Sequence, residues 1–132
     1  MAKVKKSKQL SFTMKNKVGL LSEVSRAIAS AKVNITAICA YEMENEAEFM
    51  LITQSNEKVK KALSPLKVKI EEEDIITVEM PNKVGELQKV ANKISDARID
   101  IYYMYGTAGT GKSSICVFKT SDDKKAIRVI NK

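Results

Sequence analysis

The chain has 132 residues, of which 44% are hydrophobic and 30% charged, with a formal net charge of +7 and no histidine. This balance is typical of a folded globular protein and excludes an intrinsically disordered chain, and no apolar stretch approaches the roughly 18–20 residues that cross a bilayer. Because histidine is absent, Ser-His and Cys-His nucleophilic catalysis are excluded as well. The length suits one ordinary domain or two very small units.

Lysines at positions 3, 5, 6 and 8 open the sequence, with no apolar segment behind them. This start is not a secretory signal, so we expect a cytoplasmic protein with a mobile lysine-rich leader. The leader and the lysines near the other end supply much of the excess charge. Lysine far outnumbers arginine, whereas base-reading contacts favour arginine, so the charge indicates a solvated surface more than a nucleic-acid site.

The first predicted strand is the alternating segment Leu10, Phe12 and Met14. An i, i+3, i+4 apolar stripe then predicts an amphipathic helix over residues 19–31. Strands are predicted over 33–43 and 48–53, a short helix around Val59 and Leu63, and a fourth strand over 67–70.

Residues 14–35 recur 66 positions later. The shared set holds ten identities, among them Asn-Lys-Val-Gly at 16–19 and again at 82–85. Such self-similarity indicates two copies of one supersecondary unit.

The second copy repeats the predicted elements in the same order. Its strands are expected at 76–80, 99–105 and 114–119, with helices along the stripe 87–97 and around Ala126 and Ile130. Residue 132 corresponds to Pro65, so no fourth strand follows. We expect an open sheet edge there, or one covered by another chain, and therefore a homodimer or other partner contact.

The predicted fold is α+β, a ferredoxin-like strand-helix-strand-strand-helix-strand unit repeated twice. Each antiparallel sheet carries both helices on one face, and the second copy lacks its last strand. We place the two domains at residues 8–72 and 73–132. The acidic run 71–74 between them is predicted to be a solvated turn, because one contiguous run seldom converges its oxygens on a metal.

Residues 106–113, GTAGTGKS, match the spacing of a phosphate-binding P-loop. A working P-loop leads into a helix whose free N–H groups hold the phosphates. Here Ser113 leads into Ser-Ile-Cys-Val-Phe-Lys, which is typical of a strand, so we interpret the match as a glycine-rich hairpin connection.

Cys39 and Cys116 lie far apart in apolar runs and are interpreted as reduced packing residues, with a disulfide as the alternative. Tyr102, Tyr103 and Tyr105 could stack on bases, but alternation along a strand explains them as sheet packing. No metal cluster, acid pair or activated nucleophile emerges, so we expect no catalytic residue, metal site or cofactor and no enzymatic activity.

The two Asn-Lys-Val-Gly loops carry the most informative chemistry. Each joins a strand to a helix N-terminus, whose unpaired N–H groups and partial positive charge suit a carboxylate. Glycine lets a ligand approach the backbone, and asparagine can bond either a ligand or the helix. The alternative is that Asn caps the helix and Gly only permits the turn.

The repeated unit, N-K-V-G-L-L-x-x-V-x-x-A-I-A followed by V-N-I, resembles an ACT domain. The second copy matches it with N-K-V-G-E-L-x-x-V-A-N-K-I and I-D-I. The whole chain is similar to small stand-alone proteins of two tandem ACT domains, in which I-x-Y-M-Y, here residues 101–105, is a frequent strand. ACT domains are regulatory modules that bind amino acids, often at interfaces between paired domains.

The resemblance implies ligand contacts at the strand-helix loops and at the start of the next strand. Val18 and Val84 stand where the family often has proline, which implies less rigid loops. Asp100 replaces Asn34, which implies two non-equivalent sites. The implied ligand-binding residues are Asn16, Val18, Gly19, Leu20, Asn34, Ile35, Asn82, Val84, Gly85, Glu86, Asp100 and Ile101.

These features predict a non-catalytic regulatory protein that binds a free amino acid and modulates an amino-acid biosynthetic enzyme. One alternative is a regulatory small subunit of the acetolactate synthase type, although that type usually carries a further domain. Another is a basic ferredoxin-like nucleic-acid-binding protein, which the strand residues do not favour. We expect no membrane partner.

Overall fold

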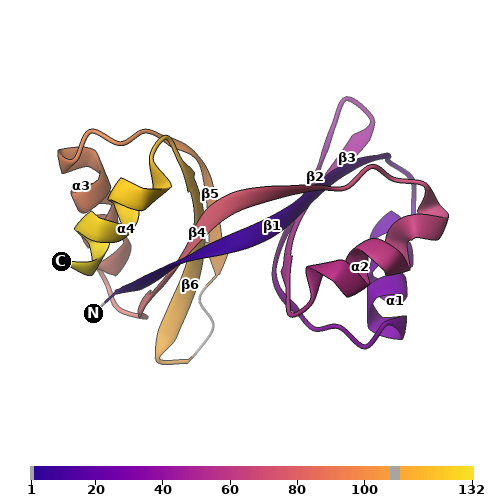
Figure 1. Cartoon of the computed structure of the whole chain (residues 1–132), viewed down its shortest axis with the longest axis horizontal. Coiled ribbons are helices and arrows are strands. Elements are labelled where there is room, and N and C mark those ends of the chain that lie inside the picture. Colours follow the sequence, from indigo (N-terminus) through magenta and orange to yellow (C-terminus); the bar gives the residue numbers. More distant parts are fainter. Residues whose placement is uncertain (1, 108–110) are drawn as a thin grey trace. The chain divides into compact units, whose positions relative to one another are not determined.

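The computed structural model of the chain describes residues 2–107 and 111–132, which form six strands and four α-helices (Figure 1). The elements are β1 (Lys3–Lys15), α1 (Leu20–Ser30), β2 (Ile35–Met43), β3 (Glu46–Thr53), α2 (Asn56–Leu63), the 3-10 turn η1 (Ser64–Leu66), β4 (Glu71–Pro81), α3 (Glu86–Asp96), β5 (Ile101–Thr107), β6 (Ser113–Thr120) and α4 (Asp123–Asn131). The strands pair antiparallel and the order is that of two ferredoxin-like repeats, so the predicted α+β fold is confirmed.

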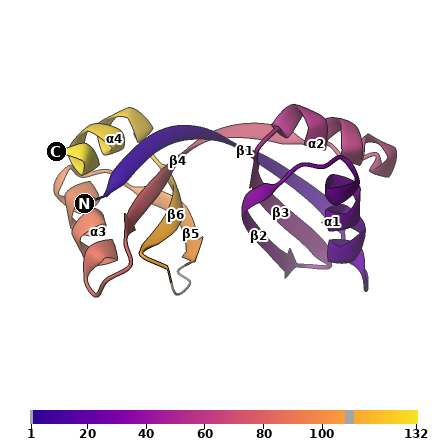
Figure 2. The same ribbon diagram turned by 90° about the horizontal axis from the view of Figure 1, so that it is seen from below.

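The chain divides into two compact units. The first unit is Lys8–Glu73, and the second unit combines residues 2–7 with Asp74–Lys132. In the first unit the strands lie in the order β2-β3-β1-β4, and in the second in the order β1-β4-β6-β5. Both helices of a unit lie on the same face of its strands (Figure 2).

The strand registers repeat between the units. In the first unit Phe12 pairs with Phe49, and in the second Val78 pairs with Cys116. Each unit also has one irregularity at the start of its edge strand, after Ile35 in β2 and after Ile101 in β5. A bulge kept at the same place in both copies indicates that the backbone itself is duplicated.

Each unit has its own apolar core between its helices and sheet. The first core contains Leu10, Phe12, Leu20, Val24, Ile28, Val33, Ala47, Phe49, Leu51, Val59 and Leu63. The second contains Ile76, Val78, Met80, Val90, Ile94, Ile99, Cys116, Phe118, Ala126 and Ile130. The helix members recur at i, i+4 spacing, which is the periodicity from which the helices were predicted.

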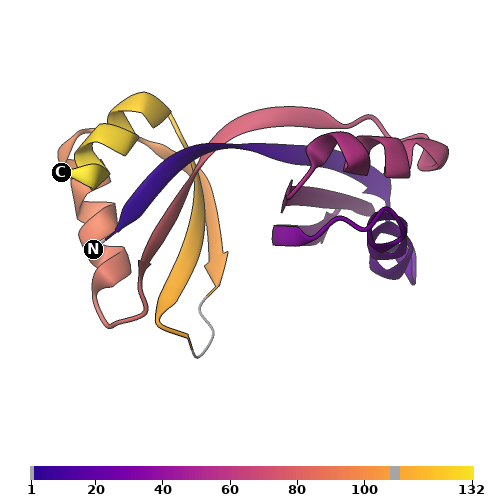
Figure 3. The same ribbon diagram turned by 60° about the horizontal axis from the view of Figure 1, so that its bottom comes forward.

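The lysine-rich start of the chain is not a mobile leader, and this prediction is wrong. Residues 3–7 form the beginning of β1, and Val4 packs against the second core with Ala2. The Val4 amide donates to Asn131 Oδ1 at 3.4 Å, so the start of β1 lies beside the end of α4 (Figure 3). Lys3 and Lys5 are exposed while Val4 is half-buried, so alternation along the strand places the lysines in solvent.

The same segment corrects the prediction of an open or partner-covered edge in the second copy. No strand follows α4, as predicted, but residues 3–7 of β1 lie next to β4 and take the fourth-strand position. The Lys6 ammonium lies 4.0 Å from the Asp74 carboxylate within this unit. The sheet is therefore completed from the opposite end of the sequence.

The junction between the copies also differs from its prediction. Residues 67–70 form no strand, because Lys67 takes a left-handed conformation (φ 55°) where η1 ends. The acidic run 71–74 is instead the start of β4, not a turn. Its charges have partners: Ser11 donates to Glu73 at 2.6 Å, and Lys60 lies 3.5 Å from Glu72.

The segment after the P-loop-like motif folds as predicted. Ser113 begins strand β6, so no helix N-terminus follows the Gly-Lys-Ser sequence. The middle of the motif, residues 108–110, lies outside the described residues. None of the helices in the described parts of the chain has the length and apolar character needed to span a bilayer.

Candidate functional site

Two glycines shape the loops that were predicted to bind a ligand. Gly19 and Gly85 precede α1 and α3 with φ of 87° and 88°, a left-handed conformation that side-chain-bearing residues rarely adopt. A Cβ on either glycine would meet nothing within 4 Å. Glycine is therefore needed at these positions for backbone conformation and not for close packing within the unit.

Neither asparagine of the repeated motif caps its helix. In the described structure no side chain caps α1 or α3. Instead, the backbone N–H of Asn16 donates to Asn45 O at 2.9 Å, and the backbone N–H of Asn82 donates to Lys112 O at 2.9 Å. The Asn82 side chain also donates to Gly111 O at 3.2 Å. Both asparagines thus tie the strand-helix loop to the neighbouring hairpin.

The helix starts keep backbone donors available. The Leu20 amide bonds to Lys17 O at 3.2 Å, and the Glu86 amide bonds to Lys83 O at 3.4 Å. The next amides, of Leu21 and Ser22 in α1, have no acceptor among the described residues. Such amides at a helix N-terminus favour an anionic group.

A pocket of about 330 Å3 lies against this loop in the first unit. Its wall combines the start of α1 with the end of β2 and the facing part of β3. The lining residues are Asn16, Lys17, Gly19, Leu20, Leu21, Ser22, Ala40, Tyr41, Glu42, Ala47 and Phe49. Of these residues, Lys17 forms an ion pair with Glu23, which does not line the pocket; its ammonium lies 3.0 Å from the Glu23 carboxylate.

A pocket of about 390 Å3 lies at the corresponding place in the second unit. It is lined by Met80, Pro81, Asn82, Lys83, Glu86, Leu87, Met104, Gly106, Thr107, Ser114 and Cys116. Most of these residues occupy positions 66 or 67 after a lining residue of the first pocket. The duplication has therefore produced two versions of one pocket.

The two versions differ in the strand residues that form their floor. Phe49 lines the first pocket and stacks on Phe12 with ring centroids 4.9 Å apart. Cys116 replaces Phe49 in the second pocket, and Gly106 stands where the first pocket has Ala40. Burial raises the pKa of the Cys116 thiol, which keeps it protonated and apolar in character.

The pocket mouths differ in charge. Leu20, the first residue of α1, is buried, whereas Glu86 at the same place in α3 is a carboxylate whose side chain is 14% exposed. A hydrogen bond from Lys89, at 2.9 Å, is the main reason that the pKa of Glu86 lies below its ordinary value, and burial opposes this shift. The second pocket thus carries its own anion at the helix start.

The structure brings only some of the predicted residues together. Asn16, Gly19 and Leu20 line the first pocket, and Asn82 and Glu86 line the second, while Gly85 opens the helix beside it. Val18 and Val84 are fully exposed at the loop tips and line neither pocket.

The ligand-binding residues predicted at the start of the next strand lie away from the pocket in each unit. Asn34, Ile35, Asp100 and Ile101 follow the far ends of α1 and α3, about 16 Å along an 11-residue helix from the loops. The Asn34 carbonyl accepts from the Gln54 amide at 3.1 Å and the Asp100 carbonyl from the Ser121 amide at 2.9 Å, so these residues hold turns together.

Sequence reasoning missed the strand residues that complete the pockets, such as Glu42 and Phe49 in the first and Gly106 and Cys116 in the second. Hairpin register could have indicated them, since Ala40 pairs with Phe49 and Gly106 with Cys116. No group of metal-ligating side chains occurs in the parts of the chain that the structure describes.

The duplicated ferredoxin-like unit, with a pocket at each strand-helix loop, defines a pair of similar domains in tandem. The family model of the ACT domain pair matches residues 5–132, so the chain belongs to this family. None of the curated proteins that were searched matches the chain.

Solved structures agree with the family. Protein BT0572 from Bacteroides thetaiotaomicron is 30% identical, with a TM-score of 0.88 over 97% of this chain and 88% of that one. The aspartokinase alpha and beta subunits are 14% identical, with a TM-score of 0.69 over 98% and 95%. The regulatory subunit of aspartate kinase from Thermus thermophilus gives the same identity and TM-score over 94% and 90%. At 14% identity these two similarities concern the fold alone.

Proposed function

We propose that this protein is a non-catalytic regulator that binds a free amino acid in its two repeated pockets. The observation that carries the proposal is the recurrence of one pocket, built from the same elements, at both Asn-Lys-Val-Gly loops. In each unit this pocket lies at the start of a helix, where backbone amides favour an anionic group such as a carboxylate.

The first pocket matches the three parts of an α-amino acid. The free amides of Leu21 and Ser22 suit the carboxylate, and the Glu42 carboxylate suits the ammonium group. Buried Leu20 and Phe49 offer an apolar wall for the side chain. We therefore propose that the first pocket takes an amino acid with an apolar side chain.

The second pocket is proposed to bind more weakly. The Glu86 carboxylate lies where the carboxylate of a ligand would meet the start of α3, and like charges repel. The non-equivalence of the two sites is thus attributed to Glu86 and not to Asp100, which lies outside the pocket.

The proposal includes a homodimer in which a second copy covers the pockets. Leu21 and Leu87 line the two pockets and are exposed, as are Val18 and Val84 at the neighbouring loop tips. Apolar side chains gathered at a rim favour burial against a partner. A ligand held at such a contact shifts the population of assemblies, which is how it would modulate a biosynthetic enzyme.

Thermal and chemical denaturation with a panel of free amino acids tests the proposal. A ligand at a hundredfold excess over its dissociation constant is expected to stabilise the protein by about 2.7 kcal/mol. Glu42→Gln should weaken the response because it removes the partner of the ammonium group. Glu44→Gln is the matched control, since Glu44 is exposed in the same hairpin but does not line the pocket.

Stabilisation by one amino acid that Glu42→Gln weakens and Glu44→Gln preserves is the expected result. No shift with any amino acid at millimolar concentration would contradict binding. Light scattering of the liganded protein that shows only monomers would contradict the homodimer.

A further inference from the structure

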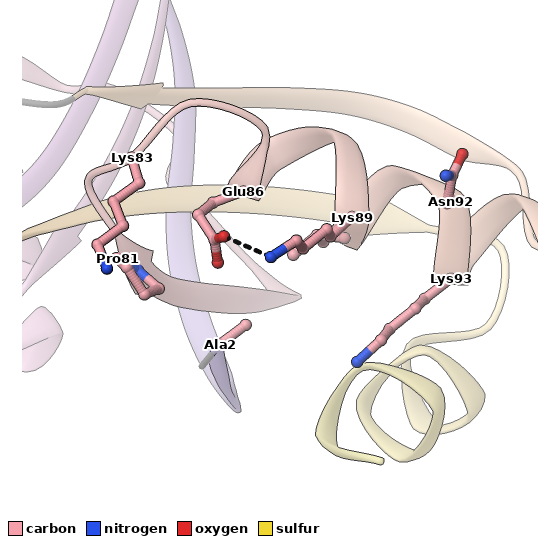
Figure 4. Close-up of a pocket in the computed structure, with 8 residues that line it drawn as sticks. Ala2, Pro81, Lys83, Glu86, Lys89, Asn92 and Lys93 are labelled. Carbon is pink, nitrogen blue, oxygen red and sulfur yellow. Dashed lines mark hydrogen bonds and ion pairs between the residues drawn. The ribbon is translucent and has the colours of Figure 1, made fainter.

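A pocket of about 570 Å3 lies in the second unit, along the side of α3, and shares Pro81, Lys83 and Glu86 with the pocket at the strand-helix loop (Figure 4). Its wall is formed by Ala2, just before β1, by the end of β4 with the loop that follows, and by helix α3. The lining residues are Ala2, Pro81, Lys83, Glu86, Lys89, Val90, Asn92 and Lys93. Its volume lies within the roughly 300–1,000 Å3 of small-molecule sites.

The residues that line this pocket are more positively than negatively charged. Three lysines and one glutamate leave a net charge of +2 (three minus one). Glu86 lies between Lys83 and Lys89 in Figure 4, and its carboxylate is 2.9 Å from the Lys89 ammonium. Since one carboxylate cannot neutralise three ammonium groups, the pocket retains positive charge.

Lys93 is held in place from outside the pocket. Its ammonium donates to Ile130 O at 3.2 Å and to Lys132 O at 3.1 Å, at the end of α4. Both oxygens lie at the end of α4, where the partial negative charge of a helix C-terminus favours the ammonium and orients the side chain. Lys83 has no ion pair among the described residues.

The first unit carries the same net charge at the corresponding positions but arranges it differently. Lys83 corresponds to Lys17, whose ammonium is paired with Glu23 at 3.0 Å. The residue that corresponds to Glu23 in the second unit is Lys89, and Lys93 replaces Ala27. Lys15 and Arg26 are replaced by Pro81 and Asn92, so in the second unit the positive charge of these positions is carried by Lys83, Lys89 and Lys93.

We propose that this pocket is a second kind of ligand site, which binds a small molecule that bears a phosphate group. A phosphate carries about −1.5 to −2 charges at neutral pH, which matches the net charge of the lining. Lysines bind phosphate as point charges, and Val90, Pro81 and Ala2 offer an apolar wall for the organic part of the ligand.

NMR titration of the full chain with inorganic phosphate, at ionic strength matched with chloride, tests the site. The amide signals of Lys83, Lys89, Val90 and Lys93 should shift in a saturable way. Lys89→Gln should weaken phosphate binding about tenfold, since it removes one charge-assisted contact. Lys89 suits this test because its side chain is 69% exposed and lines neither amino-acid pocket.

The control is Lys58→Gln, which makes the same charge change at an exposed lysine of α2 in the first unit. It should leave phosphate affinity unchanged. Equal weakening by both variants, or no saturable shift beyond chloride, would overturn the site. A panel of sugar phosphates and nucleoside monophosphates should contain one that binds more tightly than inorganic phosphate. A panel without such a member would overturn the small-molecule assignment. The amino-acid response of the first pocket, measured separately in Lys89→Gln, should persist, because Lys89 lies in the other unit.

Discussion

The two units of this protein have the same backbone fold and differ in the side chains that line their pockets. Gly19 and Gly85 have φ values within one degree of each other, and both edge strands are irregular at the same step. At the pocket floor, however, Phe49 of the first unit, which stacks on Phe12, is replaced by Cys116 in the second unit. Duplication thus preserved the loops that create a pocket, while single substitutions changed its volume and charge.

The units also differ in the origin of their fourth strand. In the first unit the start of β4 is the next strand along the chain after α2, as in a simple repeat. In the second unit the same place is taken by residues 3–7, which are remote in sequence. The second unit therefore depends on a segment that can be altered without touching the first.

The largest effect is expected from removing that segment. Deletion of residues 2–7 withdraws Val4 from the second core and uncovers one edge of β4, at a cost of about 3 kcal/mol from lost burial and strand hydrogen bonds. Hydrogen exchange should then show faster opening of β6 and α4, with little change in β3 and α1.

The control keeps the strand and changes only its exposed lysines. Lys3→Gln combined with Lys5→Gln should leave exchange rates in both units unaltered, because both side chains are exposed. Equal loss of protection in both units after the deletion would refute the dependence of the second unit alone.

The sequence predicted most of the fold because its signals are local. Apolar stripes predicted α1 and α3, and alternation predicted β1 and β4. A run rich in β-branched and aromatic residues predicted β6, and the recurrence of Asn-Lys-Val-Gly indicated the loops. The role of residues 3–7 was hidden because Val4 is the only large apolar residue among lysines, and its partner strand is far away in the chain. The pocket floor was hidden for a similar reason: the meeting of Gly106 with Cys116 depends on hairpin register, which local periodicity does not reveal.

A second test exchanges the residues that distinguish the pocket floors. In Gly106→Ala the new Cβ would lie 2.6 Å from Cys116 Sγ and 3.0 Å from Ile115 O, so strand or side chain must shift. We expect a loss of about 1–3 kcal/mol in urea denaturation, typical of overpacking. Ala40→Gly at the matching place in the first unit should cost less, about 1 kcal/mol, from backbone entropy alone. An unchanged stability of Gly106→Ala would show that β5 can move away from β6.

A third test asks whether the two loops are energetically alike. Gly19→Ala and Gly85→Ala place a Cβ in open space, so only the left-handed backbone is strained. Each should lose about 1 kcal/mol, and the two losses should be equal within error. Asparagine at either position should cost less, because it tolerates this conformation better. Losses that differ clearly between the units would reveal a contact made by one loop and not by the other.

The smallest expected effect is the dependence of stability on acid pH. It tests the Glu86 carboxylate, the charge by which the second pocket mouth differs from the first. The pKa of Glu86 is lowered from 4.5 chiefly by the hydrogen bond from Lys89, so Lys89→Gln should raise it. Because the folded pKa lies below the unfolded one, Glu86 adds stability above the unfolded pKa and loses it as the pH falls through the folded pKa. Side-chain carboxyl NMR of both forms measures the change, and an unshifted Glu86 would mean that Lys89 does not hold its charge. In the first unit Leu20 occupies this place and cannot titrate, so acid should weaken the helix start of α3 while leaving this position of α1 unaffected.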